Sequence, residues 1–221
     1  MMKIRIEWIY RIPKGNRTFF MQSEFMTLND VLLLSSDLEK SGRLKSIEYF
    51  DQQDRSWTKK ELDKLSKIHE TEPQDVSVYV DGGYDKNTKL AGLGIVIYFT
   101  QHQKKWRIRR NEQIEYITDN NEAELAAMHV AMQLLEENEV RHQTITLYSD
   151  SQVAVNQASG EWPSYEENYR LWLDKIDDLK GKMKLEVQYV QIERKDNKEA
   201  DQLANQALSG IKISGKKERS T

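Results

Sequence analysis

Residues 76–83 read VSVYVDGG, and the fold of most of the chain can be worked out from this stretch. A short valine-rich run bounded by glycine is typical of a buried β-strand. The run ends at Asp81, and Gly82 and Gly83 follow directly. Placing a carboxylate at the mouth of a buried strand is costly unless a partner compensates it. Asp81 is therefore a candidate functional residue whose partner must come from elsewhere in the chain.

The sequence after this strand predicts a mixed α/β sheet. The expected element order is β-β-β-α-β-α-α-β-α, in which the first three strands form an antiparallel meander. Alternating strands and helices after the meander favour a five-stranded sheet covered by helices on both faces. The expected strands are 76–80, 92–100, 104–117, 143–150 and 184–192, and the expected helices are 120–139, 151–159, 164–181 and 197–209.

The residues before this region predict a separate small α+β domain at 1–72. Its expected order is β-β-α-β-α, with a turn at KGN (14–16) between the first two strands and capping boxes at Thr27–Asp30 and Thr58–Glu61. The polar stretch ETEPQDV at 70–76 indicates the boundary to a second domain at 76–210. Residues 211–221 are polar and contain glycine, and we expect a flexible tail there.

Composition excludes several classes of protein. The chain has 221 residues and a formal net charge of −3, so it lacks the global basic excess of many nucleic-acid binders. It contains no cysteine, which excludes disulfides and cysteine-ligated metal sites. No apolar stretch is long enough to span a bilayer. We expect a cytoplasmic protein with no membrane partner. The first domain shows no cluster of catalytic residues, and its basic residues are either solvated or form a nucleic-acid or protein surface.

Four acidic residues fall at the ends of predicted elements. Asp81 and Asp150 end two strands that a helical crossover would place side by side, and ligands gather at that edge of an α/β sheet. Glu124 and Asp201 lie in the first turns of two helices. One such residue alone would be a helix cap or a hydrogen-bonded core group, but four converging carboxylates repel one another unless a cation neutralises them. With no cysteine or nearby histidine, the ligands are hard oxygens that suit Mg²⁺ or Mn²⁺.

Four motifs carry a resemblance to a known family. YVDGG (79–83), TDNNEAELAA (118–127), YSDSQVAVNQ (148–157) and NKEADQLANQAL (197–208) resemble the motifs of the ribonuclease HI family. The resemblance spans residues 76–210 and implies the ribonuclease H fold. It implies endonucleolytic hydrolysis of the RNA strand of an RNA/DNA hybrid, leaving 5′-phosphate and 3′-hydroxyl ends.

The resemblance also implies roles for individual residues. Asp81, Glu124, Asp150 and Asp201 match the catalytic ligands of two Mg²⁺ ions, for which Mn²⁺ is an expected substitute. In the family pattern the counterpart of Asp81 bridges both ions, those of Glu124 and Asp150 hold the leaving-group side, and that of Asp201 holds the nucleophile side. The expected substrate contacts are Gly82, Gly83, Asn87, Asn120, Asn121, Gln152 and Arg194. For Asn120 and Asn121, helix capping is a substantial alternative.

The chain departs from the family pattern in two places. The loop VQIERKDNKEAD (190–201) contains no histidine, and Arg194 stands where a histidine-free subgroup has an arginine. The basic protrusion of some members is missing, because SGEWPSYEENYRLW (159–172) is acidic and passes directly into a helix. Weak hybrid binding by this domain alone is expected, since phosphate neutralisation supplies much of the affinity. KKWRIRR at 104–110 is either a nucleic-acid surface or an edge strand protected by charge.

Three rival interpretations remain from the residues. A proofreading-type exonuclease would carry a second acid where this chain has Gly83. A transposase or integrase core would lack an acid equivalent to Glu124 in this order. The third is a non-catalytic or weakly active nucleic-acid-binding protein that keeps the fold, and the missing histidine and protrusion are compatible with it.

Overall fold

The computed structural model describes residues 2–13 and 17–219, apart from the side chains of residues 69 and 70. It divides the chain into two compact units, Met1–Thr71 and Glu72–Thr221. The turn expected at 14–16 lies outside the described residues. Within the described part of the chain, no helix is both long and apolar enough to cross a membrane.

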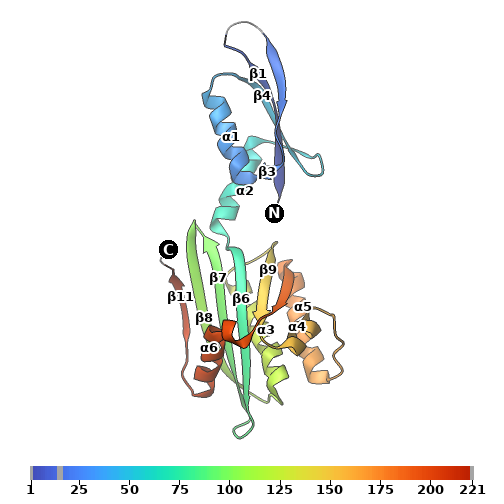
Figure 1. Cartoon of the computed structure of the whole chain (residues 1–221), viewed down its shortest axis with the longest axis vertical. Coiled ribbons are helices and arrows are strands. Elements are labelled where there is room, and N and C mark those ends of the chain that lie inside the picture. The colour runs from blue at the N-terminus through green and yellow to red at the C-terminus, as the bar shows by residue number, and fades with distance from the viewer. Residues whose placement is uncertain (1, 14–16, 220–221) are drawn as a thin grey trace. The chain divides into compact units, whose positions relative to one another are not determined.

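The N-terminal unit is a small antiparallel sheet with two helices (Figure 1). Its strand order is β2-β1-β4-β5, and the two-residue strand β3 also pairs with β1. The predicted capping boxes are confirmed: Thr27 Oγ1 accepts from Asp30 N at 3.3 Å, and Glu61 Oε2 accepts from Thr58 N at 2.8 Å. The elements are β1 (Lys3–Arg11), β2 (Thr18–Gln22), β3 (Met26–Thr27), α1 (Leu28–Lys40), β4 (Leu44–Asp51), β5 (Ser56–Trp57) and α2 (Lys59–Thr71).

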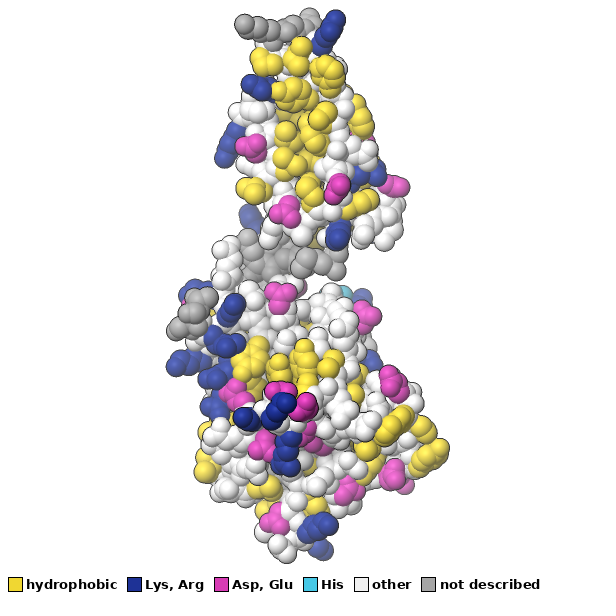
Figure 2. Space-filling model, viewed as in Figure 1, with side chains coloured by type: hydrophobic (Ala, Val, Ile, Leu, Met, Phe, Trp, Pro, Cys, Tyr) yellow, Lys and Arg dark blue, Asp and Glu magenta, His cyan; other side chains and the backbone are white. Residues whose placement is uncertain are grey.

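The N-terminal unit has its own core, which forms between one face of its sheet and its helices. Ile4, Ile6, Val31, Tyr49 and Leu62 are buried there. Alternation along β1 places Ile4 and Ile6 on this face. In contrast, every residue of edge strand β2 is exposed, and Figure 2 shows hydrophobic side chains (yellow) on the surface of this unit.

The C-terminal unit contains a six-stranded mixed sheet in the order β10-β9-β6-β7-β8-β11. β6, β7 and β8 form the predicted antiparallel meander, and β9 runs parallel to both β6 and β10. The predicted α/β class and the five predicted strands, β6 to β10, are therefore confirmed, and β11 is added as a sixth. The elements are β6 (Gln74–Asp85), β7 (Leu90–Gln101), β8 (Lys104–Glu115), α3 (Asn120–Glu137), β9 (Thr144–Ser149), α4 (Gln152–Ala158), α5 (Glu167–Met183), β10 (Glu186–Gln191), the 3₁₀ turn η1 (Arg194–Asp196), α6 (Lys198–Leu208) and β11 (Ser214–Glu218).

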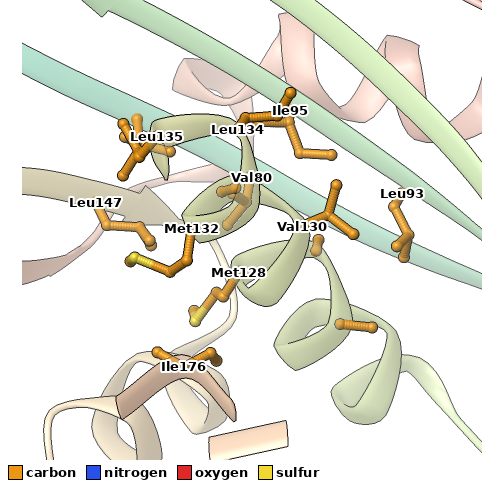
Figure 3. Packing of buried hydrophobic residues seen from close by; sticks show 14 of the residues in the cluster. Val80, Leu93, Ile95, Met128, Val130, Met132, Leu134, Leu135, Leu147 and Ile176 are labelled. Atoms are coloured by element: carbon orange, nitrogen blue, oxygen red, sulfur yellow. The ribbon is translucent and has the colours of Figure 1, made fainter. Parts of the chain in front are cut away.

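Helix α3 fills the main core of this unit, on one face of the sheet. Small and apolar residues on most sides of α3 let it pack against β6, β7 and α5 at once. Figure 3 shows Met128 and Met132 of α3 directed between Leu147 of β9, Val80 of β6 and Ile176 of α5. This packing holds the first turn of α3 beside the ends of β6 and β9.

Helix α6 covers part of the opposite face, and two glycines of β7 make its close approach possible. A Cβ built on Gly94 would lie 2.0 Å from the Ala200 carbonyl oxygen, and one on Gly92 would lie 2.2 Å from that of Ala204. Any side chain at either position would displace the helix. Glycine in β7 therefore positions the helix that carries Asp201.

The segment expected to be a flexible tail forms a strand in the structure. β11 pairs antiparallel with β8 along Ser214–Glu218 and becomes the sixth strand of the sheet. The buried side chain of Asn111 on β8 accounts for this, because its Nδ2 donates to the Ile211 carbonyl at 2.8 Å and its Oδ1 accepts from Ile213 N at 2.7 Å. The polar composition of 211–218 misled the prediction, since β11 is held by backbone pairing with β8 and by side chains of other strands, including Asn111, Lys104 and Phe99.

Candidate active site

Three of the predicted acids come together where β6, β9 and α3 meet. The sequence predicts that Asp81 ends its strand, but β6 continues to Asp85, so Asp81 lies within β6 beyond its buried valines. Asp150 follows β9 directly, and Glu124 lies in the second turn of α3. β6 and β9 are parallel neighbours, so their carboxyl ends share one edge of the sheet. One carboxylate oxygen from each residue lies within 4.8 Å of those of the other two. This is the only such group of three acids or histidines in the described part of the chain.

Burial and, second to it, mutual repulsion disfavour the ionised forms of Asp81 and Glu124. Asp81 is 7% exposed, and burial together with the charges of Asp150 and Asp201 raises its pKa to about 7, against a smaller lowering by Arg194. Burial, followed by the charges of Asp81 and Asp150, also raises the pKa of Glu124 well above its usual range. Both shifts mean that the ionised group lacks a compensating positive charge. A divalent cation would supply that charge.

Asp201, the fourth predicted acid, lies near the other three but is engaged by an arginine. Its Oδ1 accepts from Arg194 Nη2 at 2.8 Å, and its Oδ2 accepts from Asn205 Nδ2 at 3.2 Å. Arg194 is 78% exposed, and its pKa is raised by Asp201 first and by Asp81 and Asp150 further away. Arg194 therefore lies at the edge of the acidic group and is paired with one of its members.

Gly82 and Gly83, which follow Asp81, have different surroundings. A Cβ built on Gly82 would lie 2.3 Å from the Ala123 carbonyl carbon and 2.4 Å from Glu124 N. The backbone of α3 thus fills the space that we expected a substrate to approach, and the absent side chain at Gly82 brings Glu124 next to Asp81. A Cβ on Gly83 would meet only Leu208 Cδ1 at 3.4 Å.

The carboxamides expected to contact substrate lie in several environments. Asn120 Oδ1 accepts from Tyr84 N at 2.9 Å, which ties the far end of β6 to the start of α3. Neither Asn120 nor Asn121 caps α3, because the N-cap is Asp119. Gln152 is exposed at the start of α4, two residues after Asp150. Asn87 lies in the β6–β7 turn, where its backbone N–H donates to Asp85 Oδ1 at 2.8 Å.

Sequence reasoning missed two buried residues that support the acids. Ser149 Oγ donates to Glu124 Oε2 at 3.1 Å and accepts from Ser151 N at 3.0 Å. Asn197 Nδ2 donates to the Val80 carbonyl at 2.8 Å, which fixes the start of α6 against β6 beside Asp81. Ser149 and Asn197 both lie next to or within the quoted motifs. No sequence pattern, however, distinguishes a supporting serine or asparagine there from an ordinary polar residue.

These residues fit a divalent cation chemically. The donor atoms of Asp81, Glu124 and Asp150 are hard oxygens at short mutual distances, as Mg²⁺ or Mn²⁺ requires. The raised pKa values of Asp81 and Glu124 mean that their ionised forms are disfavoured without a cation. The mixed sheet, the covering helices and this acidic group at the strand ends together define a ribonuclease H-like domain.

Comparisons with known proteins give the same class and name the family. A family model described as reverse transcriptase-like matches residues 79–207, which is more than half of the chain. The chain belongs to this reverse transcriptase-like family. The match contains the entire acidic group, from Asp81 to Asp201.

Individual relatives extend the comparison. The chain is 40% identical over 195 residues to Uncharacterized protein YpeP of Bacillus subtilis (strain 168), covering 88% of this chain and 85% of YpeP. This match is longer than the C-terminal unit and so reaches into the N-terminal one. Ribonuclease HI of Haemophilus ducreyi is 35% identical over 83 residues, which is 38% of this chain and 48% of that protein. The crystal structure of LC11-RNase H1, isolated from compost, in complex with an RNA/DNA hybrid is similar with a TM-score of 0.53, 25% identity and coverage of 61% of this chain and 97% of that one.

Proposed function

We propose that the C-terminal unit is a metal-dependent endoribonuclease that hydrolyses the RNA strand of RNA/DNA hybrids and leaves 5′-phosphate and 3′-hydroxyl ends. The observation that carries the proposal is the group of three carboxylates from β6, from α3 and from the residue after β9, with oxygens within 4.8 Å of one another. The similarity to a ribonuclease H1 that binds a hybrid supports the substrate class.

Two Mg²⁺ ions are the proposed cofactors, and Mn²⁺ is the proposed substitute. Asp81, Glu124 and Asp150 would hold one ion, and Asp81 with Asp201 would hold the other. Bound in this way, the ions would lower the pKa of a water nucleophile and neutralise charge on the leaving oxygen. Holding them would also relieve the repulsion that raises the pKa values of Asp81 and Glu124.

Arg194 is proposed to change partner during this chemistry. It donates to Asp201 at 2.8 Å, and a cation that engages Asp201 competes with it for the same carboxylate. Once released, the exposed guanidinium can contact a phosphate, for which its planar donor geometry is well suited. The loop at 190–201, which contains no histidine, would in this way supply the positively charged guanidinium of Arg194 to the substrate.

Asn120 is proposed to contribute to the choice of strand. Its Oδ1 is already committed to Tyr84 N at 2.9 Å, so its Nδ2 donors are the groups that can reach a substrate. A donor in this position can bond to the 2′-oxygen that only RNA offers. Asn87, Asn121, Gln152 and Gly83 stay proposed substrate contacts, and Gly82 is assigned to packing.

One observation favours a second candidate, a nucleic-acid-binding protein that does not cleave. Asp201 is held by Arg194 and Asn205 and does not belong to the group within 4.8 Å, so this arrangement does not yet bring the fourth ligand to the other three. The second candidate is that Arg194 stays bonded to Asp201 when a hybrid binds, so that the domain binds the hybrid without hydrolysing it.

The test is cleavage of an end-labelled RNA/DNA hybrid with Mg²⁺ and separately with Mn²⁺, beside RNA/RNA and DNA/DNA duplexes. We expect cleavage of only the RNA strand of the hybrid and its loss in Asp150→Asn. Asp178→Asn is the matched control, because this exposed acid lies on α5. No cleavage with either metal by the folded protein would reject the enzyme and favour the binding protein.

A further inference from the structure

The sheet face that carries α6 is only partly covered by that helix. Residues that are paired on neighbouring strands point to the same face of the sheet. The strand registers therefore identify which residues form a row across that face. Two rows of residues cross all six strands on this face, near the start of α6. The rows, from β10 to β11, are Val190–Tyr148–Tyr79–Val96–Arg109–Gly215 and Gln188–Thr146–Ser77–Tyr98–Arg107–Lys217.

One half of this open face is a platform of three tyrosines. The rings of Tyr79 and Tyr148 stack with centroids 4.6 Å apart and planes inclined by 17°. Tyr98 meets Tyr79 edge-on at 5.8 Å and 85°. All three rings are partly exposed, and a cavity of about 190 Å³ opens beside Tyr79 and Tyr98. Tyr79 contacts both other rings, whereas Tyr148 stacks on Tyr79 alone, so Tyr148 is the ring of the three on which an unpaired base can extend the stack.

The other half carries a strong excess of positive charge. Five cations lie on this face of β8 and β11 and just after β11, namely Lys105, Arg107, Arg109, Lys217 and Arg219. Glu199 of α6 accepts from both Arg107, at 2.9 Å, and Arg109, at 3.0 Å. The Arg219 guanidinium lies 4.8 Å from the centre of the Tyr98 ring. Figure 2 shows Lys and Arg side chains (dark blue) along the side of this unit, next to exposed hydrophobic ones (yellow).

The opposite face of the same two strands is different. There Lys104 pairs with Glu218 at 2.9 Å, Arg110 pairs with Glu112 at 3.0 Å, and Lys216 lies over Phe99 and Trp106. On the open face, in contrast, Lys105 and Lys217 are exposed and form no ion pair within the described part of the chain. In the folded chain β8 is an interior strand paired with β11, so edge protection does not explain Lys105, Arg107 and Arg109. β11 is the edge strand, and charge protects an edge at Lys217 in addition to any binding role.

We infer that this open face binds single-stranded nucleic acid, with a base stacked on Tyr148 and phosphates bound by the cations of β8 and β11. The charge favours a polyanion, although the whole chain has a net charge of −3. Adjacent aromatic and basic surfaces together are the usual features of a single-strand site.

The position of the platform connects it to the candidate active site. Tyr79 precedes Asp81 by two residues on β6, and Tyr148 precedes Asp150 by two residues at the end of β9. Two residues of a strand span about 7 Å. The inference deepens the proposed function. It rests on that function for one point only, which is that the substrate would be a hybrid with a single-stranded extension.

Binding can be measured without cleavage. The probe is a fluorescein-labelled 15-nucleotide oligothymidylate, and its Kd for the full chain is measured by anisotropy in EDTA over a range of salt concentrations. For Lys105→Gln with Lys217→Gln, we expect Kd to rise about tenfold and the slope of log Kd against log salt to fall by about 1.4, since two phosphate contacts are lost. The control, Lys104→Gln with Lys216→Gln, removes the same charge from the opposite face and should change Kd less than twofold.

The aromatic half is tested separately. Tyr148→Leu removes a stacking face and should weaken binding about tenfold, within the range for one base on one ring. Tyr148→Phe keeps the ring and should bind within twofold of the unchanged protein.

Three outcomes would overturn the inference: equal losses in both lysine pairs, no difference between the Leu and Phe variants, or displacement of the probe by polyglutamate as effectively as by unlabelled oligothymidylate. The last result would indicate a surface for acidic proteins. Cleavage of a blunt hybrid is measured in parallel and should be unchanged in the Lys105/Lys217 variant. If the unchanged protein binds oligothymidylate at this face but never cleaves a hybrid, the proposed function fails and the inference stands.

Discussion

Burial of Asp81 disfavours its ionised carboxylate, which is the form that the proposed metal binding requires. Its pKa is raised to about 7 by burial and by Asp150 and Asp201, so the folded protein binds a proton that the unfolded chain has already released near neutral pH. A carboxyl group with a raised pKa favours folding at low pH, and this contribution is lost as the pH rises through the folded value. The metal-free protein should therefore lose stability between about pH 4 and pH 7.

Asp81→Asn should remove much of this pH dependence. In EDTA we expect Tm of the unchanged protein to fall from pH 5 to pH 8. At pH 8 the Asn variant should melt roughly 5 °C higher, given about 2 kcal/mol and about 2–4 °C per kcal/mol. Differential scanning fluorimetry at four pH values checks this, with Asp178→Asn as the control. Equal Tm values at pH 8 would contradict the repulsion described for the site.

Ser149→Ala should impair cleavage while leaving the fold intact. Ser149 Oγ donates to Glu124 Oε2 at 3.1 Å, so its loss leaves this carboxylate less firmly oriented. We expect a roughly tenfold lower single-turnover rate, which corresponds to about 1.4 kcal/mol for one hydrogen bond to a charged group. Ser159→Ala is the control, since that hydroxyl only caps the end of α4. An unchanged rate would show that α3 packing alone positions Glu124.

At single residues, the sequence predicted side chains whose burial costs much free energy and missed those whose burial costs little. Asp81 and Asp150 stand out because a carboxylate at a buried strand end needs a partner, and the structure brings both together with Glu124. Ser149 could not be found, because a buried serine costs little in any strand. Gly82 was assigned to substrate approach because a single sequence does not show which backbone will lie against a glycine. In the structure, that backbone is α3.

At the scale of elements, helices and strands followed their local patterns wherever those patterns were strong. The capping residues of α1 and α2 and the apolar face of α3 are local signals, and each element forms where they indicate. β11 has no such signal, since SGKKE lacks apolar alternation and all its residues are exposed. Its partners lie on β8, about a hundred residues earlier, and include Asn111, whose side chain accepts from Ile213 N.

Gly94→Ala tests whether close packing of α6 positions the fourth acid. The added Cβ would lie 2.0 Å from the Ala200 carbonyl oxygen, so α6 must shift and take Asp201 with it. We expect a loss of about 1–3 kcal/mol in unfolding free energy and a larger loss of hybrid cleavage than Tm alone explains. Gly181→Ala in α5 is the matched control, because its Cβ would meet nothing within 4 Å and alanine favours a helix by about 0.5–1 kcal/mol. Normal cleavage in Gly94→Ala would show that Asp201 tolerates a displaced helix.

At the scale of the whole molecule, the chain consists of two units with separate hydrophobic cores. The division at Thr71 and Glu72 lies close to the polar stretch around Pro73 in the sequence. The role of the N-terminal unit in binding a hybrid or a protein stays a prediction, because none of its residues belongs to the acidic group.

Residues 72–221 should fold on their own. We expect the fragment to melt within about 2 °C of the matching transition of the full chain, because its core contains no N-terminal residue. Calorimetry of both proteins tests this. The same pair then tests hybrid binding: tighter binding by the full chain would assign a substrate-binding role to the N-terminal unit, and equal affinities would exclude one.

The pairing of β8 with β11 also has a consequence for biosynthesis. β11 is translated about a hundred residues after β8, which at 5–20 residues per second leaves the outer edge of β8 without its partner for about 5–20 seconds. During this interval a nascent chain could pair that edge with a neighbouring one on the same messenger. The first part of β8, Lys104–Arg110, carries two lysines, three arginines and no acid, so the unpaired edges of identical chains repel each other there until β11 arrives.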